Sequence, residues 1–270
     1  MSQFSQSKVL LPLYIYPQVG AWDPLYTAVA ANPCVRFVVI INPNSGPGAA
    51  PWWPNEDYVR EIARLNALPN VTTLGYVRVA YCRRPVQDVL EDIETYGRRA
   101  REDDRLRVEG IFVDETVNLY SEEAKKYLDA IDRRARTLIG VVENKMASLN
   151  IFLNETEQSE LITPKMIHNP GTAVSAELAA PGPEITVVVE TSYEEFMTEG
   201  YQEWLSTSPY KRARTAYIVH SVPQGEVKAL TIALCERAEY LFVTSAFCGF
   251  YESFAGSWHD FVASLAERRK

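Results

Sequence analysis

The chain has 270 residues and a mass of 30.5 kDa, and 47% of its residues are hydrophobic, which supports a full core and excludes a disordered chain. Its formal net charge is -8 at pH 7 without a basic block, so it would repel a phosphate backbone and we expect no nucleic-acid partner. The longest apolar runs are strand-sized and far short of the roughly 20 residues of a spanning helix, so we expect no membrane span.

Eight short runs rich in β-branched and aromatic residues predict strands. Several of them, such as Phe37 to Ile41 and Ile185 to Val189, are continuously apolar, as in strands buried on both faces. The predicted strands are Val9–Tyr16, Val35–Asn42, Val71–Ala80, Val108–Asp114, Lys165–Asn169, Ile185–Glu190, Thr215–Ser221 and Tyr240–Ser245.

The segments between these runs mostly have the apolar spacing of amphipathic helices. Pro85 suits the first turn of one helix, and Ser121 can cap another that begins with Glu122 and Glu123. The clear helices are predicted over Asn55–Leu65, Val86–Ala100, Glu122–Arg136, Glu226–Ala238 and Phe254–Arg268.

This alternation predicts one α/β domain over residues 1–270, a single (β/α)8 TIM-type barrel, with an open doubly wound sheet as the alternative. The first strand runs into Tyr16-Pro-Gln-Val-Gly20 rather than a Gly-rich phosphate loop, which weighs against a nucleotide-binding open sheet. One segment, at about 139–160, has no clean period, so we interpret it as an irregular insertion or as an artefact of the gene model. We expect the protein to be a monomer.

In such a barrel the reactive groups lie at the carboxyl ends of the strands, and here these ends are polar. Asp114 and Glu115 end the fourth predicted strand, and Glu190 ends the sixth. Inward side chains of alternate strands can share one layer, so two carboxylates can face each other as glycosidic cleavage requires. One must be ionised while the other holds a proton for the leaving oxygen. Adjacent strand residues face opposite sides, so we expect at most one of Asp114 and Glu115 to aim at substrate, and a helix cap or a contact to a loop arginine is the alternative.

Further residues at or just after strand ends are candidates for binding a sugar. They are Tyr16, Asn44, Tyr76, His168, Asn169, Tyr193 and His220. Either histidine could instead be structural, and Trp52 and Trp53 could supply flat faces for sugar rings. The four cysteines are interpreted as buried thiols, with one or two disulfides as the alternative in an exported protein, and their spacing predicts no metal site. We expect neither a metal nor a cofactor.

Six segments, in order, resemble the spherulin-4 (spherulation-specific family 4) proteins over nearly the whole chain. They are Val9–Pro17, Ile41–Gly48, Gly75–Val77, Gly110–Glu115, His168–Thr172 and Val187–Glu190. That family is similar to glycoside hydrolase family 135, whose members have a (β/α)8 barrel and cleave α-1,4-linked N-acetylgalactosamine in the fungal polysaccharide galactosaminogalactan. The resemblance implies an endo-acting, retaining hydrolase with Asp114 as nucleophile, Glu190 as general acid/base and Glu115 assisting. For retention the two carboxyl groups should lie about 5–5.5 Å apart.

The resemblance also predicts an acidic residue after Thr244, where this chain has Ser245. The main alternative function is therefore a catalytically weak or inactive spherulin-4-like protein that binds a polysaccharide or acts at the cell surface. An unrelated lyase or aldolase is less favoured, because Lys165 stands at the wrong end of its strand for Schiff-base chemistry. Family members often carry a leader or an anchor, and residues 1–8 lack the features of a secretory signal, so the compartment is left open.

Overall fold

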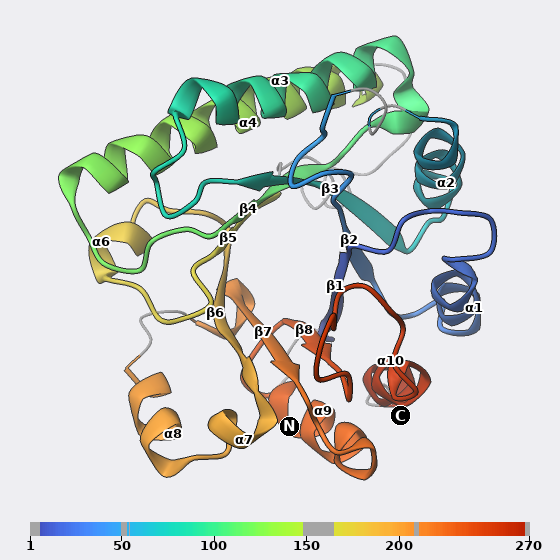
Figure 1. Ribbon diagram of the computed structural model, residues 1–270, viewed down its shortest axis with the longest axis vertical. Helices are drawn as coiled ribbons and strands as arrows, with labels where there is room; N and C mark the ends of the chain where they lie inside the picture. The colour runs from blue at the N-terminus through green and yellow to red at the C-terminus, as the bar shows by residue number, and fades with distance from the viewer. Residues whose placement is uncertain (1–5, 50–52, 54, 148–164, 208–210, 268–270) are drawn as a thin grey trace.

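The computed structural model describes residues 6–49, 53, 55–147, 165–207 and 211–267. Eight parallel strands close into a barrel in the order of the chain, and helices surround them (Figure 1). The strands are β1 (Lys8–Leu13), β2 (Phe37–Ile41), β3 (Val71–Arg78), β4 (Gly110–Asp114), β5 (Lys165–Asn169), β6 (Ile185–Ser192), β7 (Thr215–His220) and β8 (Tyr240–Val243). The predicted (β/α)8 TIM-type barrel is thus confirmed, and the open doubly wound sheet is excluded.

Alternation along the strands divides the apolar side chains between the inside of the barrel and the helices outside. Val113 of β4 and Met166 of β5 pack outward in one cluster with Ile93 and Ile131 from the covering helices. Phe112, the neighbour of Val113, belongs instead to the larger core cluster. The same alternation, continued to the ends of the strands, decides which polar side chains reach the mouth of the barrel.

All five helices predicted from the sequence are present, and apart from the end of α4 their ends shift by at most four residues. Ser121 caps its helix as predicted, because its Oγ accepts a hydrogen bond from the Ala124 N–H at 3.1 Å. The described helices are α1 (Asp23–Ala31), α2 (Glu56–Asn66), α3 (Val86–Glu102), α4 (Glu122–Ala147), α6 (Ala176–Ala179), α7 (Tyr193–Phe196), α8 (Glu199–Leu205), α9 (Val227–Leu234) and α10 (Trp258–Glu267).

The helix α4 is longer than the sequence pattern predicts. It runs to Ala147, so residues 139–147, which we expected to be irregular, are helical. Good helix formers such as Glu143, Lys145 and Met146 favour this backbone even where the apolar spacing lapses. The rest of the predicted insertion, residues 148–160, lies outside the described residues.

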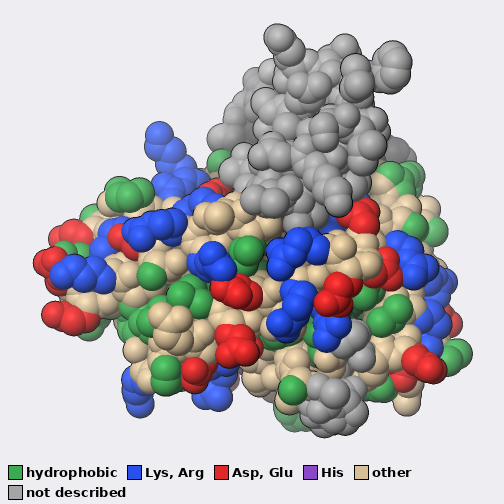
Figure 2. Space-filling view, turned by 90° about the horizontal axis from the view of Figure 1, so that it is seen from above, with side chains coloured by type: hydrophobic (Ala, Val, Ile, Leu, Met, Phe, Trp, Pro, Cys, Tyr) green, Lys and Arg blue, Asp and Glu red, His purple; other side chains and the backbone are tan. Residues whose placement is uncertain are grey.

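The helices α3 and α4 lie side by side on one flank of the barrel (Figure 1). On this flank, Lys and Arg side chains are interspersed with Asp and Glu (Figure 2). Arg134 of α4 pairs with Glu94 of α3, and Arg99 pairs with Glu102 at 2.6 Å. Exposed ion pairs of this kind contribute only about 0–1 kcal/mol each to the free energy of unfolding. Their main effect is that this flank carries charges of both signs.

The four cysteines are free thiols, and only Cys235 is fully buried, whereas Cys248 is exposed. The interpretation as buried thiols is therefore wrong for Cys248, which lies in a surface connection after β8. Within the described part of the chain, no helix has both the length and the apolar character needed to cross a membrane. Over the same residues, no group of three or more His, Cys, Asp or Glu side chains is placed to hold a metal ion.

Gly75 of β3 is required by the close approach of α3. A Cβ at this position would lie 2.8 Å from the ring of Tyr96, whose hydroxyl donates to the Tyr76 carbonyl at 3.0 Å. We expect Gly75→Ala to lower the free energy of unfolding by about 1–3 kcal/mol, because the buried ring cannot move without losing this hydrogen bond.

Urea denaturation of the wild type and the variant measures this change. Gly200→Ala is the control, because a Cβ there meets nothing within 4 Å and α8 gains a better helix former. Equal stability of Gly75→Ala and the wild type would contradict the packing argument.

Candidate active site

Asp114 is the last residue of β4 and points into the mouth of the barrel. Its Oδ2 accepts a hydrogen bond from Tyr76 Oη at 2.7 Å, and its Oδ1 accepts from Asn169 Nδ2 at 2.8 Å and from the Glu115 N–H at 2.9 Å. Burial raises the pKa of Asp114 to about 6, the charge of Glu190 adds to the rise, and the three hydrogen bonds oppose it. Asp114 is therefore a half-buried carboxyl group that titrates near pH 6.

Asn169, the last residue of β5, bridges the two predicted catalytic acids. Its Nδ2 donates to Asp114 Oδ1 at 2.8 Å and to Glu190 Oε2 at 2.7 Å, while its Oδ1 accepts from the Gly171 N–H at 3.0 Å. Because both carboxylate oxygens contact the same nitrogen, they cannot be further apart than the two distances together, 5.5 Å. The Gly171 carbonyl in turn accepts from the Glu190 N–H at 3.1 Å, which ties the turn after β5 to β6.

The second oxygen of Glu190 is held by a tyrosine from the last connection of the chain. Tyr251 Oη donates to Glu190 Oε1 at 2.6 Å. The ring of Tyr14 contacts the rings of both other tyrosines, with its centroid 5.5 Å from that of Tyr76 and 5.0 Å from that of Tyr251. Burial raises the pKa of all three tyrosines, with the nearby carboxylates adding to the rise, so their hydroxyls stay protonated at neutral pH.

Tyr251 reaches the site because the barrel opens between β8 and β1. These strands pair only over the first two residues of each, whereas β1 and β2 pair from Val9 to Leu13. Beyond the last pair, the connection to α10 fills the gap, and the Tyr14 N–H donates to the Tyr251 carbonyl at 3.0 Å. This bond also explains why β1 ends at Leu13 and not at Tyr16 as predicted.

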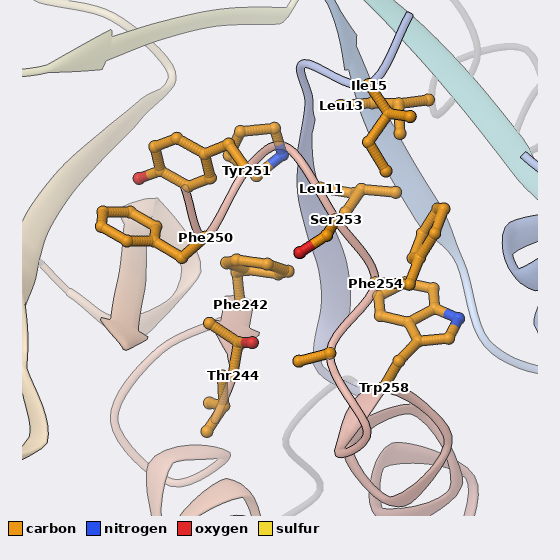
Figure 3. A pocket seen from close by; sticks show the side chains of 13 residues that line it. Leu11, Leu13, Ile15, Phe242, Thr244, Phe250, Tyr251, Ser253, Phe254 and Trp258 are labelled. Atoms are coloured by element: carbon orange, nitrogen blue, oxygen red, sulfur yellow. The ribbon is translucent and has the colours of Figure 1, made fainter. Parts of the chain in front are cut away.

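An apolar pocket lies at this opening, beside the main chain that carries Tyr251 (Figure 3). Figure 3 shows Phe250 and Tyr251 at one side of the pocket and Phe254 and Trp258 at the other. The lining of this pocket is mostly apolar, and it includes residues of the connection between β8 and α10. The hydroxyl of Tyr251 is directed to Glu190.

Glu115 takes a different direction from Asp114, as we expected for adjacent residues. Its backbone is left-handed, with a φ of 56°, and its Oε1 accepts from Arg78 Nε at 2.9 Å. Glu115 is thus a half-buried member of an ion pair at the rim, while Asp114 faces Asn169. The alternative of a contact to an arginine describes Glu115 and not Asp114, although Arg78 ends β3 and does not lie in a loop.

The turn after β3 has the same left-handed backbone as Glu115. Ala80, Tyr81 and Cys82 have φ values of 49°, 55° and 62°, and each such residue costs about 1–3 kcal/mol. The surrounding chain holds the turn, because the Tyr81 N–H donates to the Glu115 carbonyl at 2.7 Å and Arg84 Nη1 donates to the Arg78 carbonyl at 3.1 Å. Strain of this kind is concentrated at functional sites.

His220 ends β7 on the same face as the acids. Glu190 is in register with Ile218, so His220 lies two residues further along that face. Its ring stacks on Phe250, with centroids 4.2 Å apart and an interplanar angle of 9°, and its Nδ1 is 2.9 Å from Ser221 Oγ. Burial lowers the pKa of His220, so the ring is neutral at neutral pH.

His168, in contrast, faces away from the site because its neighbour Asn169 faces inward. Its Nε2 is 2.7 Å from Oδ1 of Asp132 on α4, and both side chains are buried. The structural alternative therefore describes His168, and the prediction that it binds substrate does not fit this position.

Tyr16, Asn44 and Tyr193 follow β1, β2 and β6 at the mouth end of the barrel, outside the network of the acids. Tyr16 Oη donates to Asp57 Oδ2 at 2.8 Å, Asn44 is exposed, and Tyr193 begins α7 half-buried against the core. Trp53 is buried and cannot be a platform for a sugar ring, and Trp52 lies outside the described residues.

Two residues of the network, Tyr14 and Tyr251, are missing from the residues predicted to bind substrate. Tyr14 lies inside the predicted first strand, and Tyr251 lies seven residues beyond Thr244, so a search of strand ends alone overlooks both. The signal for Tyr251 was the aromatic run Phe247–Tyr251 in a connection on the active-site side of the barrel.

Known proteins resemble this chain in sequence. The family model described as spherulation-specific family 4 matches residues 8–265. Spherulin-4 of Physarum polycephalum is 28% identical over 229 residues, which cover 83% of this chain. The match spans 58% of the length of that relative.

Known structures agree with this match. Sph3 of Aspergillus clavatus, solved in complex with GalNAc, has a TM-score of 0.79 and 32% identity, covering 97% of this chain and 98% of that one. Isoenzyme 2 of the α-L-fucosidase from Paenibacillus thiaminolyticus, with a TM-score of 0.56 and 10% identity over 98% of this chain and 49% of that one, shares the fold alone. Because the family model covers nearly the whole barrel, this chain belongs to spherulation-specific family 4.

Proposed function

We propose that the protein is an endo-acting glycoside hydrolase that cleaves α-1,4-linked N-acetylgalactosamine in a galactosaminogalactan-type fungal polysaccharide by a retaining, two-carboxylate mechanism. The observation that carries this proposal is the Asn169 bridge, which holds oxygens of Asp114 and Glu190 within 5.5 Å of each other. This separation suits a retaining pair, because inverting enzymes keep their carboxyl groups about 6.5–9.5 Å apart to admit a water. The GalNAc bound to Sph3 supports the class of sugar.

In this mechanism Asp114 attacks the anomeric carbon while the bond to the leaving oxygen breaks and Glu190 gives that oxygen a proton. Glu190 then takes a proton from a water, the water oxygen attacks the same carbon, and Asp114 is released. The family resemblance assigns the two roles. A nucleophilic carboxyl group must be ionised. With a pKa of about 6, Asp114 is mostly ionised only above that pH.

The remaining polar groups support this pair. The Tyr76 and Asn169 donors stabilise the Asp114 anion, and Glu115 assists from its ion pair with Arg78. The stacked, neutral imidazole of His220 binds the sugar next to Glu190. Tyr16, Asn44 and Tyr193 contact the polysaccharide at the rim, and the protein acts as a monomer.

A polysaccharide-binding protein without turnover is the second candidate, and Ser245 is the residue that favours it. The resemblance predicts a carboxylate at this position after β8, whereas Ser245 offers only a hydroxyl there and its N–H donates to Ser257 Oγ at 2.9 Å. The intact pair of Asp114 and Glu190 favours the hydrolase.

Product analysis tests the hydrolase directly. We expect the wild type to release short N-acetylhexosamine oligomers from galactosaminogalactan, and we expect Asp114→Asn and Glu190→Gln to release none that mass spectrometry detects. Glu102→Gln, a matched change on the outer side of α3, should behave as the wild type. An intact polymer that still binds to the folded wild type would favour the binding protein instead.

The pH profile tests the role of Asp114. Its raised pKa predicts that kcat/KM falls as the pH drops through about 6, because the protonated carboxyl group cannot attack. Tyr76→Phe removes a hydrogen bond that lowers this pKa, so the acidic limb should move to higher pH. An acidic limb that Tyr76→Phe leaves in place would mean that another group controls it.

A further inference from the structure

We propose that Tyr81 is the platform of an outer subsite, on which a hexosamine ring of the polysaccharide stacks beyond the sugar that meets the acids. This inference rests on the proposed function and adds a specificity-determining residue at the rim. Tyr81 directly follows the predicted strand Val71–Ala80 but is not among the residues predicted to bind substrate, and its place in the fold makes it a candidate.

Most of the large apolar side chains that are exposed in the described residues belong to connections that follow strands. The exposed side chains are Tyr16, Val19, Tyr81, Leu119, Tyr120, Met197, Ile232 and Phe247. All of them except Ile232 of α9 lie in the connections that follow strands, which form the mouth.

Tyr81 differs from the other exposed residues in the way its backbone is fixed. It is the middle residue of the left-handed turn Ala80–Cys82, and its side chain is 53% exposed. Non-glycine residues rarely adopt this backbone, so the surrounding hydrogen bonds must hold the turn, and the turn fixes the place at the rim from which the Tyr81 side chain extends. A backbone that is already fixed loses no conformational freedom when a ligand stacks on the ring.

The hydrogen bonds of this turn join Tyr81 to the catalytic strand. The Val79 N–H donates to the Asp114 carbonyl at 3.1 Å, and the Tyr81 N–H donates to the Glu115 carbonyl at 2.7 Å. Tyr81 therefore lies beside Glu115, the residue after Asp114, on the side of the mouth that β3 forms. A ligand that reaches Tyr81 from Asp114 passes the ion pair of Glu115 and Arg78.

The surroundings of the ring suit a sugar. The guanidinium carbon of Arg83 lies over one face of the Tyr81 ring, 5.8 Å from its centroid, so a ligand would stack on the opposite face. A hexosamine presents C–H groups on one face and hydroxyls at its edge, and so it can stack on that face of the ring.

A second aromatic surface lies on the opposite side of the acids. The stacked pair of His220 and Phe250 belongs to β7 and the connection after β8, whereas Tyr81 follows β3. In the barrel order, Asp114 and Glu190 on β4 and β6 lie between these two surfaces. A polysaccharide bound to both would cross the mouth, as endo-cleavage requires.

Binding measurements in the Glu190→Gln background test the subsite without cleavage. Tyr81→Asn removes the ring but suits the left-handed backbone, and Tyr81→Phe keeps the ring. By calorimetry with α-1,4-linked N-acetylgalactosamine oligomers of increasing length, we expect Tyr81→Asn to weaken binding of the longer oligomers about three- to tenfold. The shortest oligomers should bind unchanged, and Tyr81→Phe should match the Glu190→Gln parent.

Ile232→Ala, the exposed apolar residue away from the mouth, controls for general surface effects. Should Tyr81→Asn fail to fold, Tyr81→Trp provides the opposite change, because a larger ring should tighten binding of long oligomers. Equal affinity of all folded variants for long oligomers would overturn the subsite alone. Failure of the Tyr81-intact Glu190→Gln protein to bind any oligomer would overturn the proposed function together with the subsite.

Discussion

The amide of Asn169, placed between two carboxylates, is the interaction on which this site depends. Like charges 5.5 Å apart, the upper limit for these two oxygens, repel by about 3 kcal/mol at an effective dielectric constant of about 20, so an unsupported pair would separate or take up a proton. Asn169 donates one N–H to each acid, and Gly171 fixes the amide in turn. The arrangement exists because β4, β5 and β6 are neighbours in the closed barrel, with the amide on the middle strand.

Two tyrosines hold the carboxylate oxygens that the Asn169 amide does not bind. Tyr76 and Tyr251 each donate to the carboxylate oxygen that Asn169 leaves free, one on Asp114 and one on Glu190. Tyr251 can do so only because β8 and β1 separate near the mouth and admit the connection to α10. The opening in the barrel is therefore part of the site, and the mostly apolar residues around it line a pocket beside the connection that carries Tyr251.

The barrel and the central acids could be predicted from the sequence, because both follow from local patterns. Continuous apolar runs predict buried parallel strands, and the alternation of side chains separates Asp114 from Glu115. Its place at a strand end alone predicts that His168 lies at the site, whereas the alternation of side chains directs it outward to Asp132 on α4.

The other features of the site could not be predicted, because they depend on contacts between residues that are distant in the sequence. Tyr251 meets Glu190 across 61 residues, and nothing near either residue predicts that pairing. The left-handed turn at Ala80–Cys82 is held by Glu115 from the next strand, so no local signal such as glycine marks it. The helical residues 139–147 were missed for the converse reason, since helix propensity acts there without a regular apolar face.

The stereochemistry of cleavage tests the central claim most directly, namely that Asn169 holds Asp114 and Glu190 at a retaining distance. Proton NMR of an α-1,4-linked N-acetylgalactosamine oligomer during cleavage shows which anomer of the new reducing end forms first. The account predicts the α anomer, with the β anomer appearing later by mutarotation. A β anomer formed first would show inversion and would contradict the account, because an inverting pair needs its carboxyl groups about 6.5–9.5 Å apart to admit a water together with the substrate.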